Sequence, residues 1–286
     1  MNNLSHTIRR FNRFELKYII TMKQAAQFKE QLRAYLIPDE HGRNNGRYQV
    51  CNLYYDSPDY RCYQEKMDGC KSRRKLRLRR YMNDENLTEG TSIFVEIKQR
   101  IDRVTQKRRV ILPYRKALLL CNDRQFPDSC GEDSTVIEEI YAFVWQYNLI
   151  PANIIRYERQ AFIGTDYDIG LRVTFDTNLS FQASNLYLHA QSTYLPMLNP
   201  NLVVMEIKVN ERIPYWLTEM IAFHNLQINN FSKYCQSINA AHSISAAGIN
   251  PNARLHPYLA ERSDEVLSSI PSIFHPLNQN MEVGRN

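Results

Sequence analysis

Five short stretches of this chain carry charged residues at every second position, with apolar residues between them. They are Glu15-Leu16-Lys17, Arg77-Leu78-Arg79, Glu96-Ile97-Lys98, Leu171–Phe175 with Arg172 in it, and Glu206-Ile207-Lys208. Because successive side chains of a β-strand point to opposite faces, each stretch predicts a strand with one apolar and one charged face. One such strand would be an ordinary surface strand. Five of them predict a sheet that curls its charged faces inward around an anion, because clustered Arg and Lys repel one another without one.

The length and charge of the chain fit a globular protein with an anionic partner. Its 286 residues suffice for one large domain or two small ones, and its 43% hydrophobic and 23% charged content is ordinary for a globular protein. The net charge of +6 favours anions but does not separate nucleic acid from nucleotide or phosphate.

The sequence shows no sign of export or membrane insertion. No apolar run reaches the roughly 18–20 residues that span a bilayer, and the polar segment 1–10 does not resemble a secretory signal. The six cysteines form no C-x-x-C pair, and their scatter is typical of reduced thiols rather than of a disulfide framework. We therefore expect a cytoplasmic protein without a transmembrane segment.

Periodicity and turn residues predict a strand-rich chain with helices between the strands. Strands are expected over residues 14–20, 49–56, 71–81, 93–100, 103–112, 154–163, 170–176 and 201–209, and another near 186–189. Helices are expected from the N-cap Thr21 to residue 36, from Ser57-Pro58 to Asp68-Gly69, over 114–120, 134–147 and 214–226, and from the N-cap Ser232 to residue 246. This order predicts an α+β fold, with one antiparallel barrel decorated by helices over residues 1–248 and a poorly ordered tail over 249–286.

The densest charged segment is the basic run over residues 71–80. It is compatible with a solvated edge strand or a nucleic-acid patch. The cations that share one face of the predicted strand are Arg73, Lys75, Arg77 and Arg79. Guanidinium groups on one face suit phosphate oxygens, because each fork binds two of them. No aromatic residues interleave with the run as a stacking platform would, so phosphate or nucleotide is favoured over nucleic acid.

Glu96-Ile97-Lys98 and Glu206-Ile207-Lys208 are two copies of one short pattern. Each is compatible with a cross-strand ion pair, which contributes little at a surface. In the functional interpretation the glutamate is an oxygen ligand of Mg²⁺ or Mn²⁺ and the lysine binds phosphate, since one or two carboxylates plus substrate phosphates are the usual magnesium ligands. The chain lacks a P-loop, a G-x-G-x-x-G loop, a G-x-S-x-G elbow and an H-E-x-x-H motif, so strand side chains would have to bind the phosphates.

Seven motifs in this order resemble a known family. They are Phe14-Glu15-Leu16-Lys17-Tyr18, Leu76-Arg77-Leu78-Arg79-Arg80-Tyr81, Phe94-Val95-Glu96-Ile97-Lys98, Tyr157-Glu158-Arg159-Gln160-Ala161-Phe162, Leu171-Arg172 with Phe175-Asp176-Thr177, Glu206-Ile207-Lys208 and Ser232-Lys233-Tyr234. Together they are similar to the VTC domain, the catalytic domain of the vacuolar transporter chaperone polyphosphate polymerases. That domain is a triphosphate tunnel metalloenzyme of the CYTH-like superfamily. The resemblance spans roughly residues 8–245.

The resemblance implies an eight-stranded antiparallel β-barrel tunnel with a charged interior. It implies that the γ-phosphate of ATP is transferred to a growing inorganic polyphosphate chain, with release of ADP and with Mn²⁺ or Mg²⁺ as cofactor. The catalytic residues it implies are Arg77, Arg79, Lys98 and Arg159. The substrate-binding residues are Lys17, Lys107, Arg109, Tyr157, Arg172, Lys208, Ser232 and Lys233, with Lys107 and Arg109 depending on the register, because Arg108 offers another. The metal ligand is Glu206, assisted by Glu15 or Glu96.

One position departs from the wider superfamily. Arg13 stands where many tunnel enzymes carry the first glutamate of Glu-x-Glu-x-Lys. Fewer carboxylates are then left to activate water, which fits synthesis better than hydrolysis. The expected partners are ATP and inorganic polyphosphate or pyrophosphate, not nucleic acid, and membrane coupling is expected only through a partner. The alternatives are a tripolyphosphatase or nucleoside triphosphatase in the same tunnel, and a non-catalytic module that binds polyphosphate or RNA.

Overall fold

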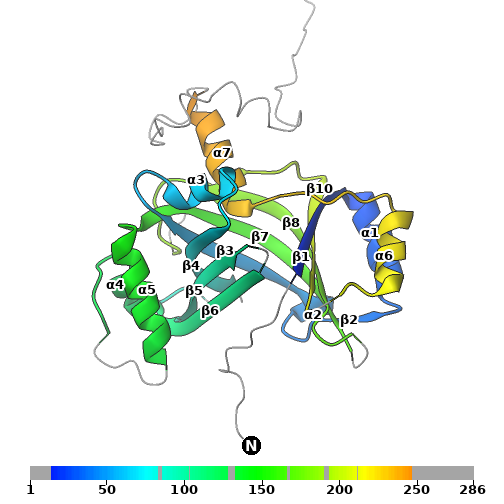
Figure 1. Cartoon of the computed structure of the whole chain (residues 1–286), viewed down its shortest axis with the longest axis horizontal. Helices are drawn as coiled ribbons and strands as arrows, with labels where there is room; N and C mark the ends of the chain where they lie inside the picture. The colour runs from blue at the N-terminus through cyan, green and yellow to red at the C-terminus, as the bar shows by residue number, and fades with distance from the viewer. Residues whose placement is uncertain are drawn as a thin grey trace, which may run out of the picture.

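An antiparallel sheet of ten strands forms the centre of an α+β fold (Figure 1). The computed structural model describes residues 14–82, 86–102, 104–127, 133–165, 168–189, 193–210 and 212–246. The tail predicted over 249–286 lies outside the described residues. None of the helices within these segments is long and apolar enough to cross a membrane.

The elements follow one another along the chain as strands with helices between them. The strands are β1 (Phe14–Thr21), β2 (Leu36–Pro38), β3 (Arg47–Asp56), β4 (Ser72–Met82), β5 (Ser92–Ile101), β6 (Val104–Pro113), β7 (Ile150–Gly164), β8 (Arg172–Gln182), β9 (Leu195–Pro196) and β10 (Leu202–Val209). The helices are α1 (Met22–Leu32), α2 (Arg43–Gly46), α3 (Arg61–Met67), α4 (Tyr114–Cys121), α5 (Ser134–Gln146), α6 (Tyr215–Phe223) and α7 (Lys233–Ala246).

Eight of the strands form one continuous hydrogen-bonded path. Its order is β1-β10-β8-β7-β3-β4-β5-β6, while β2 pairs with β7 and β9 with β8. In the part of the chain that the structure describes, β1 and β6 at the two ends do not pair, so backbone hydrogen bonds do not close the predicted barrel. The sheet nevertheless curls. This is shown by Lys98 Nζ on β5, which lies 2.8 Å from Glu15 Oε2 on β1. The path therefore surrounds an inner face on which its first and seventh strands meet.

The outer face of the curled sheet is apolar, and helices cover it on two sides (Figure 1). Leu76 and Leu78 of β4 belong to a core with Phe143 of α5, and this core also includes residues of α4. On the other side Tyr18 of β1 belongs to a core with Phe28 of α1, to which α6 contributes. The apolar side chains of these strands point outward, and since successive side chains point to opposite faces, the charged side chains between them point inward.

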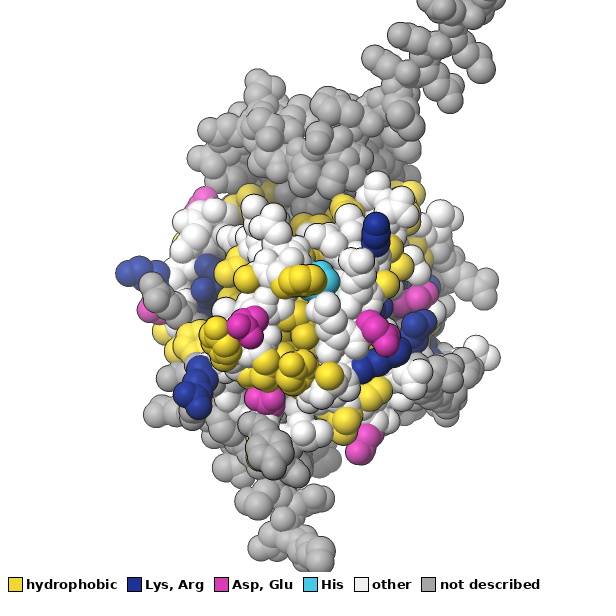
Figure 2. All heavy atoms as spheres, turned by 90° about the vertical axis from the view of Figure 1, so that its right-hand side faces the viewer, with side chains coloured by type: hydrophobic (Ala, Val, Ile, Leu, Met, Phe, Trp, Pro, Cys, Tyr) yellow, Lys and Arg dark blue, Asp and Glu magenta, His cyan; other side chains and the backbone are white. Residues whose placement is uncertain are grey.

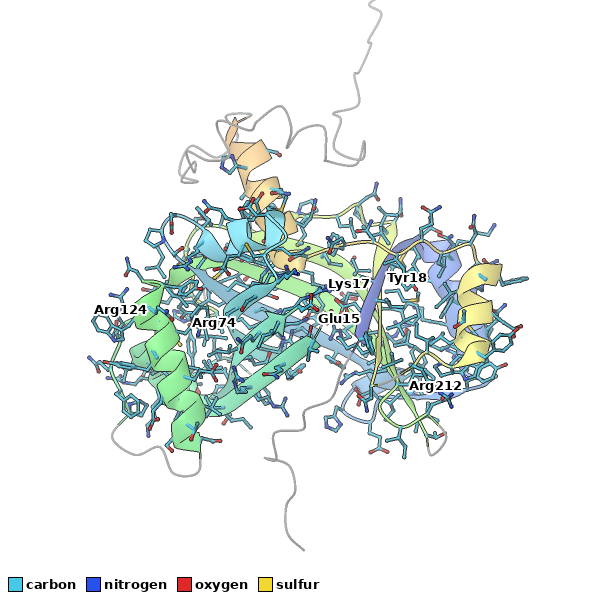
Figure 3. The ribbon with its side chains drawn as sticks, viewed as in Figure 1. Glu15, Lys17, Tyr18, Arg74, Arg124 and Arg212 are labelled. Atoms are coloured by element: carbon cyan, nitrogen blue, oxygen red, sulfur yellow. The ribbon has the colours of Figure 1, made fainter. Side chains whose placement is uncertain are left out.

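Figure 3 shows this alternation on single strands. Glu15 and Lys17 lie on one side of β1, and Tyr18 lies on the other side, toward α1 and α6. On β4, Arg74 lies toward α5, where its guanidinium carbon is 4.3 Å from the centre of the Phe143 ring. The two neighbours of Arg74 therefore point inward. The sequence prediction of charged faces directed inward is confirmed for both strands.

Helix α7 closes over one end of the inner face, next to α3 (Figure 1). Its Tyr234 and Ile238 pack in a third core with Tyr54 of β3 and Ile155 of β7. The Tyr234 hydroxyl also donates a hydrogen bond to the Asp56 carboxylate at the end of β3. The start of α7 is thus fixed beside the charged part of the inner face, and we call this end of the sheet the α7 mouth.

The helix predicted to begin at Ser57-Pro58 begins instead at Arg61. Tyr60 has a φ of 56°, in the left-handed region, which interrupts the helical backbone before Arg61. The Asp56 carboxylate accepts hydrogen bonds from the backbone N–H groups of residues 57, 62 and 63, and these bonds stabilise the turn that precedes α3.

Two further predictions about elements are wrong. The first helix ends at Leu32 and not at residue 36, because Leu36–Pro38 pairs with β7 as a short strand. The strand predicted near 186–189 does not form. There the Leu188 N–H binds the Tyr114 hydroxyl at 3.1 Å, and so it is not free to extend the sheet.

The face formed by α1 and α6 exposes large apolar side chains among its charged ones (Figure 2). Phe223 and Tyr215 of α6 are 77% and 76% exposed. Nearby, the rings of Tyr35 and Trp216 stack with their centres 4.1 Å apart. Aromatic side chains of α6 therefore reach the surface on this face.

Candidate active site

The register of the sheet places opposite charges side by side on its inner face. Lys17 of β1 is directly opposite Glu206 of β10, and Arg77 of β4 is opposite Glu96 of β5. Eight cations and four carboxylates form ion pairs within 4.0 Å there. They are the cations Lys17, Arg77, Arg79, Lys98, Lys107, Arg159, Lys208 and Lys233, and the carboxylates Glu15, Glu96, Asp176 and Glu206. The inner face therefore carries a surplus of positive charge.

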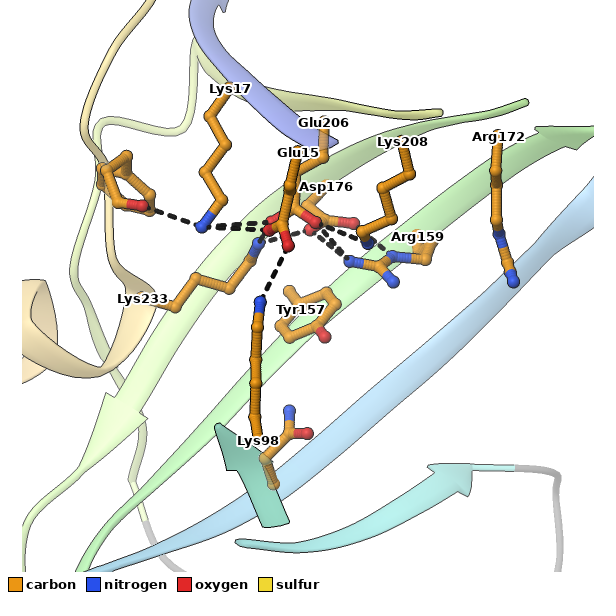
Figure 4. A network of polar contacts seen from close by, with 12 residues as sticks. Glu15, Lys17, Lys98, Tyr157, Arg159, Arg172, Asp176, Glu206, Lys208 and Lys233 are labelled. Atoms are coloured by element: carbon orange, nitrogen blue, oxygen red, sulfur yellow. Dashed lines mark hydrogen bonds and ion pairs between the residues drawn. The ribbon is translucent and has the colours of Figure 1, made fainter. Parts of the chain in front are cut away.

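Glu206 is the most heavily shared of these carboxylates (Figure 4). It is 5% exposed, and its oxygens lie 2.7 Å from Lys233 Nζ and 2.9 Å from Lys208 Nζ. Lys17 and Arg159 lie farther away, at 4.0 and 3.7 Å. Burial opposes ionisation, but the four cations outweigh it and hold the pKa of Glu206 well below its ordinary value. Glu206 is therefore ionised, and it is their common counterion.

Glu15 links β1, the first strand of the path, to β5, the seventh. Its carboxylate lies 2.8 Å from Lys98 Nζ and 3.3 Å from Lys17 Nζ. Burial raises the pKa of Glu15, while Lys98 and Lys17 lower it, and the net pKa lies well below the ordinary value. Lys17 also donates a 2.9 Å hydrogen bond to the carbonyl of Phe231, just before α7. Glu15 on the edge strand is therefore connected through Lys17 to the segment just before α7.

Asp176 is a site residue that sequence reasoning did not single out. It is fully buried and accepts two hydrogen bonds from Arg159, at 2.6 and 2.7 Å, while Lys233 Nζ lies 2.6 Å away. Burial disfavours a charged Asp176, but these two cations lower its pKa below the ordinary value. Its position two residues after Thr174 and four after Arg172 is the period-2 signal that could have placed it on the inner face.

Glu96 forms a second group on β4, β5 and β6. It is fully buried, with Arg77 at 2.7 Å, Lys107 at 3.1 Å and Arg79 at 3.8 Å. Burial raises the pKa of Glu96, but Arg77, Arg79 and Lys107 lower it far more. Glu96 therefore stays ionised and holds the two arginines of the basic run side by side.

Three uncharged side chains orient the arginines of β4. Arg79 donates to Asn52 Oδ1 at 2.8 Å and to the Tyr157 hydroxyl at 3.3 Å, and Arg77 donates to the Tyr54 hydroxyl at 3.1 Å. Tyr157 was predicted to belong to the site, whereas Asn52 and Tyr54 were not. The polar Asn52 inside an otherwise apolar run of β3 was the available signal.

Some predicted residues lie at the margin of the network. Arg172 donates to Asp39 at 2.6 Å and to the Tyr48 hydroxyl at 2.8 Å, and so it does not join the Glu206 group. Ser232 lies at the α7 mouth, where its hydroxyl is 3.3 Å from Lys75 Nζ. The structure thus places both of these side chains around the central cations rather than among them.

The register of β6 settles which of its cations face inward. Lys107 is opposite Lys98, and Arg109 is opposite Glu96, with its guanidinium carbon 4.8 Å from the centre of the Phe94 ring. Arg108 instead pairs with Glu139 of α5 on the outer face. Of the two registers considered from the sequence, the structure has the one that places Lys107 and Arg109 inside.

The donor set for a metal consists of separate carboxylates. In the described segments no three His, Cys, Asp or Glu residues gather in a cluster that could hold a metal ion. Glu15 and Glu206 both contact Lys17, so they lie near each other, but their oxygens are occupied by ammonium groups. Mg²⁺ commonly takes one or two carboxylates and completes its shell with phosphate oxygens and water. Glu15 and Glu206 are therefore donors of the type that Mg²⁺ takes, but ammonium groups bind their oxygens in this structure.

A curled antiparallel sheet with this charged inner face is the architecture of a tunnel-fold enzyme. The VTC domain family matches the chain over residues 12–242, and the chain belongs to that family.

Other comparisons give remote similarity. No curated protein matches the chain. A "putative adenylate cyclase" of Bacillus halodurans is 13% identical with a TM-score of 0.44, over 77% of this chain and 95% of that one. A protein of Pyrococcus horikoshii OT3 is 11% identical with a TM-score of 0.42, over 80% and 99%. A "putative adenylate cyclase" of Vibrio parahaemolyticus is 11% identical with a TM-score of 0.40, over 78% and 98%. The family assignment rests on the VTC match and not on these structures.

Proposed function

We propose that this chain is a polyphosphate polymerase, which transfers the γ-phosphate of ATP to the end of an inorganic polyphosphate chain and releases ADP. Membership of the VTC domain family supports this proposal. The observation that carries it is the surplus of cations on the inner face, where eight cationic side chains share four carboxylates. A chain of linked phosphates would neutralise that surplus.

The inner cations would have different roles according to their positions. Arg77 and Arg79, which Glu96 holds side by side, would bind the triphosphate of ATP through their guanidinium forks. Lys98 and Arg159 would neutralise the charge that develops during transfer. The remaining inner cations would hold the acceptor chain. Catalysis would then consist of positioning and charge stabilisation, which suffices for phosphoryl transfer.

The carboxylates favour synthesis over hydrolysis. Neighbouring cations hold the pKa values of Glu15, Glu96, Asp176 and Glu206 below their ordinary values, against the effect of burial. A carboxylate with a lowered pKa is a weak base, and activation of water needs a base matched to the working pH. The terminal oxygen of an acceptor phosphate is already ionised and needs no such base. This supports a phosphate acceptor over the triphosphatase that the sequence left open.

Mn²⁺ or Mg²⁺ is the proposed cofactor. Glu206, with Glu15 beside it, would hold the ion after their lysines turn to the bound phosphates. Glu96 suits a counterion better, because it is fully buried and contacts two arginines and a lysine. The bound ion would neutralise phosphate oxygens during transfer.

The predicted cytoplasmic location remains part of this proposal. Five cysteines of the described segments are free thiols, as expected in a reducing compartment. The proposed partners are ATP and inorganic polyphosphate or pyrophosphate. If the chain works at a membrane, we expect a partner protein to hold it there.

Product analysis tests the proposed function. The purified chain is incubated with ATP and Mn²⁺, with and without a pyrophosphate primer, and the products are resolved on a gel stained for polyphosphate. Polymer together with ADP supports the polymerase. Free phosphate without polymer would favour the triphosphatase, and no turnover would favour a binding module.

The role of Glu206 gives a sharper prediction. We expect Glu206→Gln to lower metal-dependent ATP turnover by about 100-fold or more, a typical loss when a charge-stabilising group is removed from an active site. Tripolyphosphate binding in the presence of a chelator should persist, because the surrounding cations remain. Polymer synthesis at the normal rate by this variant would contradict the metal assignment.

A further inference from the structure

Four cations at the α7 mouth lack the acidic partners that the inner cations have. They are Lys66 of α3, Arg73 and Lys75 of β4 and Arg100 of β5, and we call them the mouth cluster. Among the described residues none of the four forms an ion pair with a carboxylate. Lys66 binds Asn230 at 2.8 Å, Lys75 binds Ser232 at 3.3 Å, and Arg73 and Arg100 bind backbone carbonyls at 2.6 and 2.8 Å.

The sheet holds these like charges close together. Arg73 is directly opposite Arg100, and Lys75 is directly opposite Lys98. Like charges at such positions destabilise a sheet. Burial first, then Arg73 and Lys75, lowers the pKa of Lys66 to about 8, and burial together with Arg100 lowers the pKa of Arg73. The cluster is therefore a place where added negative charge would relieve repulsion.

The mouth cluster continues the phosphate site in a line. Arg79, Arg77, Lys75 and Arg73 follow one another on the inner face of β4, and at about 3.3 Å per residue the line is about 20 Å long. Lys75 contacts Ser232, the residue before Lys233, whose ammonium group reaches Glu206. A chain of three phosphates is much shorter than this line, whereas a long polyphosphate chain could follow it from the inner site to the α7 mouth.

The chemistry of the cluster favours phosphate over nucleic-acid bases. Lys75 Nζ lies 4.8 Å from the centre of the Tyr234 ring, but that ring is 2% exposed and packs in the core beneath α7. It is therefore not available as a stacking platform. What the cluster presents to a ligand is a row of charged donors.

We propose that the mouth cluster binds the part of a polyphosphate chain that extends beyond the inner site, so that long chains pass out of the tunnel between α3, α7 and the paired start of β4 and end of β5. This proposal rests on the proposed function, because it takes the ligand of the inner site to be polyphosphate. It adds a chain-length-dependent site for the same ligand.

The test compares binding of tripolyphosphate and of long-chain polyphosphate by calorimetry. The mouth variant combines Lys66→Gln, Arg73→Gln and Arg100→Gln and leaves Lys75 in place beside Ser232. The control variant removes three exposed charges elsewhere, by Lys23→Gln on α1, Arg47→Gln at the start of β3 and Lys116→Gln on α4. Both variants lose the same net charge, so non-specific attraction changes equally.

We expect the mouth variant to bind long-chain polyphosphate roughly tenfold or more weakly than the control variant, since three charged contacts are lost. Its affinity for tripolyphosphate should match that of the control. Without ligand, the mouth variant should melt at a higher temperature than the control, because like-charge repulsion is relieved.

Two results would overturn the proposal. If the affinities for both ligands fall equally, the cluster belongs to the inner site. If neither affinity falls more than in the control variant, the cluster does not bind the chain. The proposed function is judged separately, by ATP turnover of the unmodified chain. Length-dependent binding without polymer synthesis would keep the mouth site and reject the polymerase.

Discussion

Single carboxylates on the inner face act as internal counterions for cations that the proposed substrate would otherwise neutralise. Asp176 alone contacts Arg159 through two hydrogen bonds and Lys233 through an ion pair. All three side chains are buried, so losing one partner leaves the others charged in a medium of low dielectric.

The first prediction concerns Asp176. We expect Asp176→Asn to lower the free energy of unfolding by about 3 kcal/mol, because a buried ion pair that loses one partner leaves an uncompensated charge. Urea unfolding measures this, and added tripolyphosphate should restore part of the loss. Glu30→Gln on α1 is the control, since Glu30 pairs with Arg33 at the surface and such changes stay within about 0.5 kcal/mol. Equal stability of the two variants would contradict the assigned role.

The second prediction concerns pH. The pKa of Lys66 is lowered to about 8, so above that pH the free protein loses this charge. The affinity for long-chain polyphosphate should therefore fall as pH rises through 8. Where the ligand still binds above this pH, Lys66 should take up a proton on binding. Lys66→Arg keeps the charge, because the pKa of an arginine exceeds about 12. Calorimetry at pH 7 and pH 9 should show a smaller loss of affinity for this variant than for the unmodified chain, and identical losses would contradict the prediction.

Local sequence predicted some of the site residues and could not predict others. Lys17, Arg77 and Glu206 alternate with apolar neighbours, so strand periodicity alone placed them on one face. Period 2 from Arg172 and Thr174 also places Asp176 on that face, but its ion-pair partners Arg159 and Lys233 come from distant parts of the chain, which no local pattern contains. Arg172 satisfies the alternation but pairs with Asp39, which only the folded chain brings near it.

At the scale of elements, the start of α7 is fixed by a small set of polar contacts. The Asp56 carboxylate accepts the Tyr234 hydroxyl as well as the backbone N–H groups of residues 57, 62 and 63. The same contact therefore joins β3, α3 and α7. Lys233 precedes Tyr234 directly, so the position of its ammonium group depends on this anchor.

The third prediction follows from that anchor. We expect Tyr234→Phe to lower the free energy of unfolding by about 1.5–3 kcal/mol, the range for a hydrogen bond to a charged group, and to lower ATP turnover because Lys233 is less well positioned. Tyr55→Phe is the control, since it removes a hydrogen bond to Asn122 away from α7. It should lower stability without affecting turnover. A turnover loss equal in both variants would contradict a specific role for the anchor.

Closure of the predicted barrel is the property of the fold that the sequence could not predict. Charge alternation predicted five of the eight strands of the continuous path and their inward charges, and residue type and turn signals predicted the other three. Whether β1 and β6 pair depends on curvature and stagger, which are properties of the whole sheet and not of either strand. Among the described residues β1 and β6 stay unpaired, and the ion pair between Glu15 and Lys98 joins β1 to β5, the strand next to β6.

The whole molecule is a curled sheet with its apolar face outside, beneath two pairs of helices, and its charges inside. Its inner cations outnumber its inner carboxylates, so the free protein should be stabilised by a bound polyanion. At a concentration of 100 times its Kd, tripolyphosphate adds about 2.7 kcal/mol to the free energy of unfolding. This corresponds to a rise in Tm of roughly 5–10 °C. Differential scanning fluorimetry measures the shift, with sodium chloride of equal ionic strength as control. An unchanged Tm at millimolar tripolyphosphate would contradict an interior anion site.

The most direct test of the central claim follows the phosphate itself. The chain is incubated with Mn²⁺, a pyrophosphate primer and ATP labelled in the γ-phosphate, and the label in polymer is compared with the ADP formed. We predict equal amounts of polymer-bound label and ADP, and loss of both with Arg77→Ala. Label released as free phosphate in proportion to ADP, with none in polymer, would contradict the assignment as a polymerase.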